Sequence, residues 1–219
     1  WASVGSIIIG VLQIFIANLL GGIRLSRPGL YLVGACHALT ITSLAALMLS
    51  GNSAWGVVAG IFALGTLSAY FVLTRAWRSA LNTNRPALRA ATLSAFLWTF
   101  CAWGMLAASV VTPDEAFHLL ATGFGFSLIL SLSLHIVGHI SGADALSPAT
   151  SCTLVLLWQL VPLLRGLARP LSLPPESATF VGVIATVVIV VWAGALLPCE
   201  VRILKRQFQL RGSEVMVQD

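Results

Sequence analysis

The sequence predicts an all-α membrane protein, a polytopic bundle of about seven transmembrane helices that forms a single domain over residues 1–219. Hydrophobic residues make up 58% of the chain, charged residues make up only 9%, and the mean hydropathy is +0.96. A soluble domain needs far more charge to cover its surface. Runs of about 20 apolar residues, each long enough to cross about 30 Å of hydrocarbon, recur along the whole chain. We therefore expect the lipid bilayer to surround most of the protein.

Uninterrupted hydrophobicity places the individual spans. Their approximate bounds are residues 4–22, 29–50, 53–74, 90–111, 116–141, 149–165 and 178–199. The breaks between them carry turn and loop residues, for example Gly51 to Ser53 and the Pro-rich run from Arg169 to Pro175. The short loops predict that consecutive helices pack antiparallel. If the sixth span, which contains Gln159 and Pro162, does not cross, the orientation of the C-terminus reverses.

The basic residues predict how the bundle is oriented. They group after spans one, three and seven, and if all seven spans cross, all of them except Arg165 and Arg169 fall on one side. Cytoplasmic loops are enriched in Lys and Arg, so we expect the N-terminus outside and the C-terminus in the cytoplasm, in a bacterial inner membrane. Because membrane topology accounts for these charges, the net charge of +5 does not indicate nucleic-acid binding.

Most other polar groups in or beside the spans predict structure rather than chemistry. Asp114 and Glu115 precede His118, but the run from Thr112 to Glu115 has the pattern of a helix start, with Thr112 as N-cap and Glu115 completing a capping box. Three amides, in Gln13, Asn18 and Gln159, are expected to join helices by hydrogen bonds. The tryptophans are expected near span ends, where indoles prefer the membrane interface; they include Trp55, Trp77, Trp98, Trp103 and Trp158.

The candidates for chemistry are the four histidines, because an ionisable residue inside a membrane is costly unless it is paired or liganded. His37 lies in span two, about 12 Å from its predicted inner end, and His135 lies in span five, about 9 Å from its inner end. If these helices are neighbours, His37 and His135 could ligate one haem iron from opposite sides, in an apolar slot between helices. The alternative is that each histidine only hydrogen-bonds across helices to a carbonyl or to a serine such as Ser131.

Span five carries the remaining histidines. His135 and His139 are four residues apart and share one helix face, at a spacing that can also clamp a metal ion. His118 lies within about 60° of that face at the other end of the span. These positions could hold a second cofactor, line a quinone or proton path, or lie at the membrane interface. Gly34 and Gly138, each one turn from a candidate ligand, would let a macrocycle approach the backbone.

Two stretches of span five carry a family resemblance. HLLATG from His118 to Gly123 and GHISG from Gly138 to Gly142 resemble the NnrS family of polytopic haem- and copper-containing membrane proteins linked to nitric oxide metabolism. The HALT stretch from His37 to Thr40 looks like the same kind of helix opening. The resemblance covers about thirty residues. It implies histidine-ligated haem b in a helical bundle and, as the less favoured cofactor, copper.

Three functions compete on this reading. The leading hypothesis is a haem-binding membrane subunit, an oxidoreductase subunit if it is part of an enzyme, that exchanges electrons with a quinone or other redox subunits or handles a small redox gas. The second is a cofactor-free subunit that anchors or scaffolds a larger complex. The third is a transporter, for which the sequence shows no pair of broken helices in matching positions. We find no nucleophile with a base partner, phosphate loop or zinc signature.

Overall fold

The chain is helical through nearly all of the part that the structure describes. This computed structural model describes residues 23–82, 85–141, 145–166, 168, 171–174 and 176–215, without the side chains at 79, 131, 138 and 139 or beyond 205. The helices are α2 (Arg27–Ser50), α3 (Ala54–Leu73), α4 (Ala76–Asn82), α5 (Pro86–Ala107), α6 (Pro113–His118), the π-helix η1 (Leu119–Phe126), α7 (Ser127–Ser141), α8 (Pro148–Trp158), α9 (Leu160–Gly166) and α10 (Glu176–Val215). The predicted span at 4–22, with Gln13 and Asn18, lies outside the described residues.

Six helical stretches are long and apolar enough to cross a membrane. They are Arg27–Ser50, Ala54–Leu73, Pro86–Ala107, Pro113–Val137, Pro148–Gly166 and Glu176–Lys205, and they correspond to predicted spans two to seven. The all-α fold class is therefore confirmed for the described residues, and the chain is an integral membrane protein. The count of seven spans and the orientation stay predictions.

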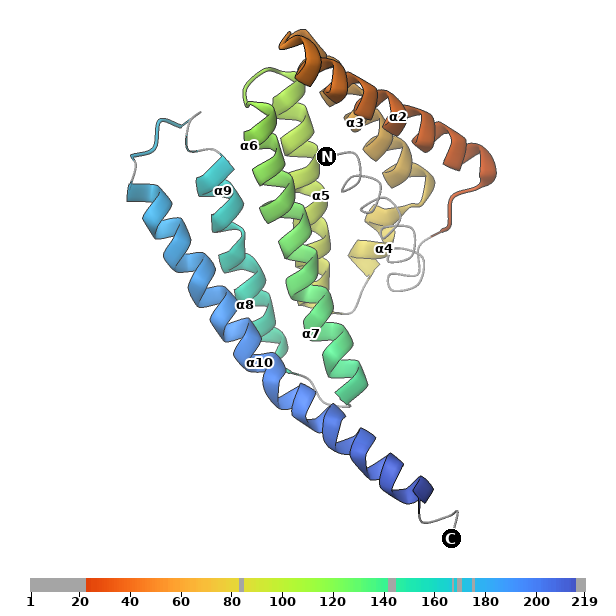
Figure 1. Cartoon of the computed structure of the whole chain (residues 1–219), viewed down its shortest axis with the longest axis vertical. Coiled ribbons are helices and arrows are strands. Elements are labelled where there is room, and N and C mark those ends of the chain that lie inside the picture. The colour runs from red at the N-terminus through yellow and green to blue at the C-terminus, as the bar shows by residue number, and fades with distance from the viewer. Residues whose placement is uncertain are drawn as a thin grey trace.

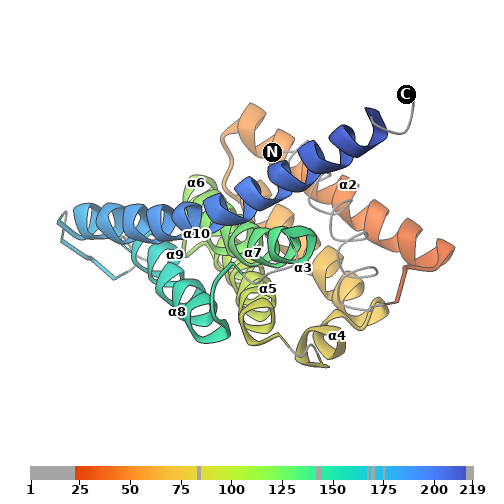
Figure 2. The same ribbon diagram turned by 90° about the horizontal axis from the view of Figure 1, so that it is seen from below.

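Helix α5 is at the centre of the bundle. It packs against α3 on one side and against η1, α7 and α8 on the other, while α2 packs on α3 and α10 packs on α7, α8 and α9. Figure 1 shows this order, with α10 running past the end of the other helices. Seen from below in Figure 2, α2, α3 and α4 lie on one side of α5, and α8 and α9 lie on the other. The bundle thus has two halves that share α5.

Small residues let α3 and α5 approach closely. Gly56, Ala59, Gly60 and Ala63 are buried along one face of α3, and α5 buries several alanines in turn. At Gly60 an added Cβ would lie 2.7 Å from the backbone nitrogen of Ala107, closer than real Cβ contacts allow. Small residues at such interfaces are typical of membrane helices. Because lipid is as apolar as the helices, the hydrophobic effect does not drive them together, and close backbone packing stabilises the contact instead.

Spans five and six depart from regular α-helix where they face each other. Span five contains the π-helix η1 between α6 and α7, and span six is broken at Gln159 into α8 and α9. Pro162 has no backbone N–H to donate back to Trp158, which accounts for the break. In span seven the helix extends to Val215, well beyond its predicted end at residue 199, although it contains Pro198.

The outer helices expose large apolar side chains. Tyr31 and Met48 on α2 are 78% and 77% exposed, and Val190 and Leu197 on α10 are 63% and 61% exposed. Apolar side chains that point outward from a spanning helix contact lipid rather than water. The expected contact with the lipid bilayer is therefore supported by the outward faces of both helices.

Candidate functional site

His135 lies at a cavity at one end of the bundle. The cavity has a volume of about 220 Å³ and is formed where α5 begins, where α7 approaches its end and where α8 begins; its lining residues are Arg85, Pro86, Ala87, Leu88, Leu134, His135, Ala145, Leu146, Pro148 and Ser151. Inside it, Nη1 of Arg85 contacts Nδ1 of His135. A guanidinium and an imidazole therefore share one wall of the cavity.

The contact with Arg85 determines which nitrogen of His135 carries the proton. A guanidinium has donors and no acceptor, so Nδ1 of His135 accepts the hydrogen bond and Nε2 holds the proton in the neutral ring. An axial histidine of haem needs the opposite arrangement, with a bare Nε2 toward the iron and an Nδ1–H that donates to an acceptor. His135 can ligate iron only after its ring turns away from Arg85.

His37 lies on the inner face of α2. It follows Val33 by four residues and precedes Thr40 by three, and both of these neighbours are buried, so the three side chains share the face that packs on α3. His37 itself is half-buried. Its helix packs mainly on α3, whereas the helix of His135 packs mainly on α5, α8, α10 and η1.

One apolar cluster includes side chains from both α2 and α7. Its buried members include Val33 on α2, Phe96 on α5 and Phe124 on η1, and Leu132 on α7 packs against it. Val33 lies one turn before His37, and Leu132 lies one turn before His135. The cluster therefore includes one residue that lies a helical turn before each histidine in the sequence.

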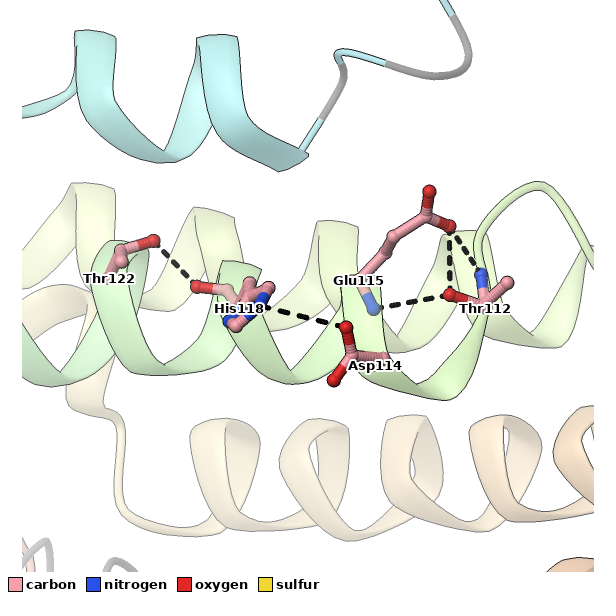
Figure 3. A network of polar contacts seen from close by, with 5 residues as sticks. All are labelled: Thr112, Asp114, Glu115, His118 and Thr122. Atoms are coloured by element: carbon pink, nitrogen blue, oxygen red, sulfur yellow. Dashed lines mark hydrogen bonds and ion pairs between the residues drawn. The ribbon is translucent and has the colours of Figure 1, made fainter. Parts of the chain in front are cut away.

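His118 lies at the other end of span five, about 25 Å from His135 along the helix. Its Nε2 is 3.6 Å from Oδ2 of Asp114, one turn back, and its backbone carbonyl accepts a 2.6 Å hydrogen bond from the Thr122 hydroxyl (Figure 3). The side chains of His118 and Asp114 are 42% and 82% exposed. An exposed contact of this kind, which is ionic only when the imidazole is protonated, stabilises a helix only slightly.

The capping box expected at the start of span five is confirmed. The Thr112 hydroxyl accepts from the backbone N–H of Glu115, and the Glu115 carboxylate accepts from the backbone N–H of Thr112 at 2.7 Å (Figure 3). Pro113 occupies the first turn of α6. The two carboxylates beside His118 are thus explained by helix initiation.

A metal cluster does not form among the predicted ligands whose side chains are described. Within the described residues, no group of three or more His, Cys, Asp or Glu residues is placed to hold a metal ion. The side chain of His139, and with it the predicted His135–His139 clamp, lies outside the described residues. The structure thus separates His37, His118 and His135 into three different surroundings.

A hydrogen-bonded network joins the centre of the bundle. Trp98 on α5 donates from Nε1 to Oε1 of Gln159 at 2.8 Å, and Gln159 donates from Nε2 to the Ser127 hydroxyl at 3.2 Å. Trp158 donates from Nε1 to the carbonyl of Thr122 in the π-helix at 2.8 Å. The prediction that Gln159 joins helices is confirmed. The interfacial interpretation of Trp98 and Trp158 is wrong, because both indoles are buried and bonded to neighbouring helices.

The sequence reasoning also missed Arg85 as a partner of His135. From the sequence, Arg85 is one of the basic residues that follow span three and indicate only topology. The available signal was local, since an Arg-Pro pair directly before an apolar run places the guanidinium at a helix start. The contact itself could not be predicted from local sequence patterns, because Arg85 and His135 are 50 residues apart.

No known protein family, curated protein or solved structure matches this chain.

Proposed function

We propose that this protein is a haem-binding integral membrane subunit, with His37 and His135 as axial ligands, that passes electrons between a quinone and a partner protein or acts on a small redox gas such as nitric oxide. The observation that supports it is the apolar cluster around Phe96 and Phe124, which α2 and α7 enter one turn before each histidine. A porphyrin requires an apolar slot of this kind between helices, with a neutral imidazole at each side.

The haem would supply the one-electron chemistry, and the chain's own residues would position it. His135 would have to exchange its contact with Arg85 for one to an acceptor, so that Nδ1 keeps a proton and Nε2 is bare. The aromatic rings of Phe96 and Phe124 would exclude water from the slot. His118 and His139 stay candidates for a second metal, copper included, with His118 held at present by Asp114.

The visible absorption spectrum of the purified protein, oxidised and then reduced, tests this proposal. A reduced α band with one bound iron, lost in both His37→Ala and His135→Ala, is the expected result. His118→Ala is the matched control, because it removes a histidine of the same span at the opposite end and should leave the band in place. A colourless, iron-free protein isolated with its native partners would show that the proposal is wrong.

A cofactor-free anchor or scaffold subunit is the second candidate. It is favoured by the Arg85–His135 contact, which gives His135 a structural partner without any cofactor. The exposed apolar faces of α2 and α10 could equally receive other membrane subunits. The same spectrum separates the two candidates, since this one requires unchanged optical properties in both histidine variants.

A further inference from the structure

The cavity at Arg85 and His135 combines positive charge with an apolar wall. Arg85 supplies guanidinium donors, and His135 and Ser151 are the other polar residues of the lining. Leu88, Leu134 and Leu146 complete the lining. A cavity with a basic part and an apolar part can bind a molecule that is anionic at one end and apolar at the other.

The helix starts around the cavity reinforce its preference for an anion. Pro86 at the start of α5 and Pro148 at the start of α8 both belong to the lining, so the first residues of two helices form part of the cavity wall. The positive end of each helix dipole therefore lies at the cavity that Arg85 also lines. These dipoles add to the charge of Arg85, which is the group that would hold the anion.

We propose that this cavity binds the phosphate of an anionic phospholipid headgroup, with Arg85 as the main contact and the leucine side chains against the glycerol and acyl region. Its place favours a lipid over free phosphate: Arg85 directly precedes a membrane span, on the predicted cytoplasmic side. Basic pockets between membrane helices on that side are suited to anionic headgroups.

Native mass spectrometry of the full chain, extracted in detergent and titrated with lipid, tests the proposal without any need for a chromophore. Phosphatidylglycerol should be retained about tenfold better than phosphatidylcholine at equal concentration, which corresponds to about 1.4 kcal/mol. In Arg85→Ala this preference should be lost. Arg89→Ala is the matched control, because it removes the same charge one turn further along α5, at a residue that does not line the cavity.

Two further variants distinguish a lost binding site from misfolding of the Arg85→Ala variant. Arg85→Lys keeps the charge and should keep most of the preference, whereas Ala145→Leu leaves every charge in place and fills the cavity, so it should lower retention. Equal loss in Arg85→Ala and Arg89→Ala would overturn the proposal, since net charge alone would then explain binding. Retention that survives Arg85→Ala unchanged would also overturn it.

Two further measurements identify which group binds in the cavity. Inorganic phosphate, tested alone, should compete only weakly; if it binds Arg85 in preference to phosphatidylglycerol, the lipid assignment is wrong. Asp144 belongs to the segment 142–144, outside the described residues, and it neighbours the lining residue Ala145. If phosphatidylglycerol is retained only by Asp144→Asn, a carboxylate of the chain takes the place of the lipid and the proposal fails.

Discussion

The replacement Gln159→Leu tests whether the central hydrogen-bonded network holds α5 and α7 against the break between α8 and α9. Gln159 lies at the break between α8 and α9, and its side chain accepts from Trp98 on α5 and donates to Ser127 on α7. Leucine has a similar volume, so it preserves packing and removes both interhelical hydrogen bonds. The Trp98 side chain, 9% exposed, would be left with a buried N–H without an acceptor.

The expected loss of stability follows from these two bonds. An interhelical hydrogen bond in a membrane protein contributes about 0.6 kcal/mol on average and up to about 1.7 kcal/mol. A buried donor left without an acceptor costs about 1–3 kcal/mol. The Ser127 hydroxyl can turn to a carbonyl of its own helix, which limits the cost on that side. We therefore expect Gln159→Leu to lower the free energy of unfolding by about 2 kcal/mol.

Reversible unfolding in mixed micelles of increasing denaturing-detergent fraction, followed by tryptophan fluorescence, measures this change. Thr153→Val is the matched control on the same span, because its hydroxyl bonds only back to Ala149 in its own helix and its loss should cost less than about 0.5 kcal/mol. A double-mutant cycle with Trp98→Phe should show a coupling of at least about 0.5 kcal/mol. Equal stability of Gln159→Leu and Thr153→Val, or zero coupling, would refute the reasoning.

Two other substitutions test the helix contacts and the helix start. Gly60→Ala should destabilise the protein by about 1–3 kcal/mol in the same assay, because the added Cβ meets the backbone of Ala107. Gly65→Ala on the same helix, where nothing lies within 4 Å, is the control and should be neutral or slightly stabilising. A larger loss of stability in Gly65→Ala than in Gly60→Ala would contradict the α3–α5 packing. Thr112→Ala should cost about 1 kcal/mol by removing the capping box, while an unchanged midpoint would show that the cap is dispensable.

The helical spans could be predicted because each depends on its own residues. A segment of about 20 apolar residues is stable in hydrocarbon only as a helix, whatever its neighbours are, since every backbone N–H and C=O must be satisfied within the segment. Most ends moved by a few residues, for example from 90–111 to Pro86–Ala107, but the last helix extends to Val215 instead of ending at residue 199. The capping box at Thr112 was equally predictable, because all of its contacts lie within one turn.

The candidate site was predictable only in part. The sequence placed His135 near the inner end of span five, and the structure places it at a cavity, but beside a guanidinium. His37 and His135 were expected at similar depths in the membrane. Depth alone does not indicate which helices pack together, because helices at any position in the membrane plane can carry residues at the same depth. The structure shows α2 on α3 and α7 on α5, and one apolar cluster includes Val33 on α2 and Leu132 on α7.

Membrane residence and the extent of most spans follow from hydrophobicity along the chain, a local property. The tertiary structure decided the partners: Arg85 with His135, 50 residues apart, and Trp98 with Gln159, 61 residues apart. Such pairs depend on which helices lie side by side and on how each is rotated. In a membrane that choice rests on close packing and a few hydrogen bonds, because lipid is as apolar as the helices themselves.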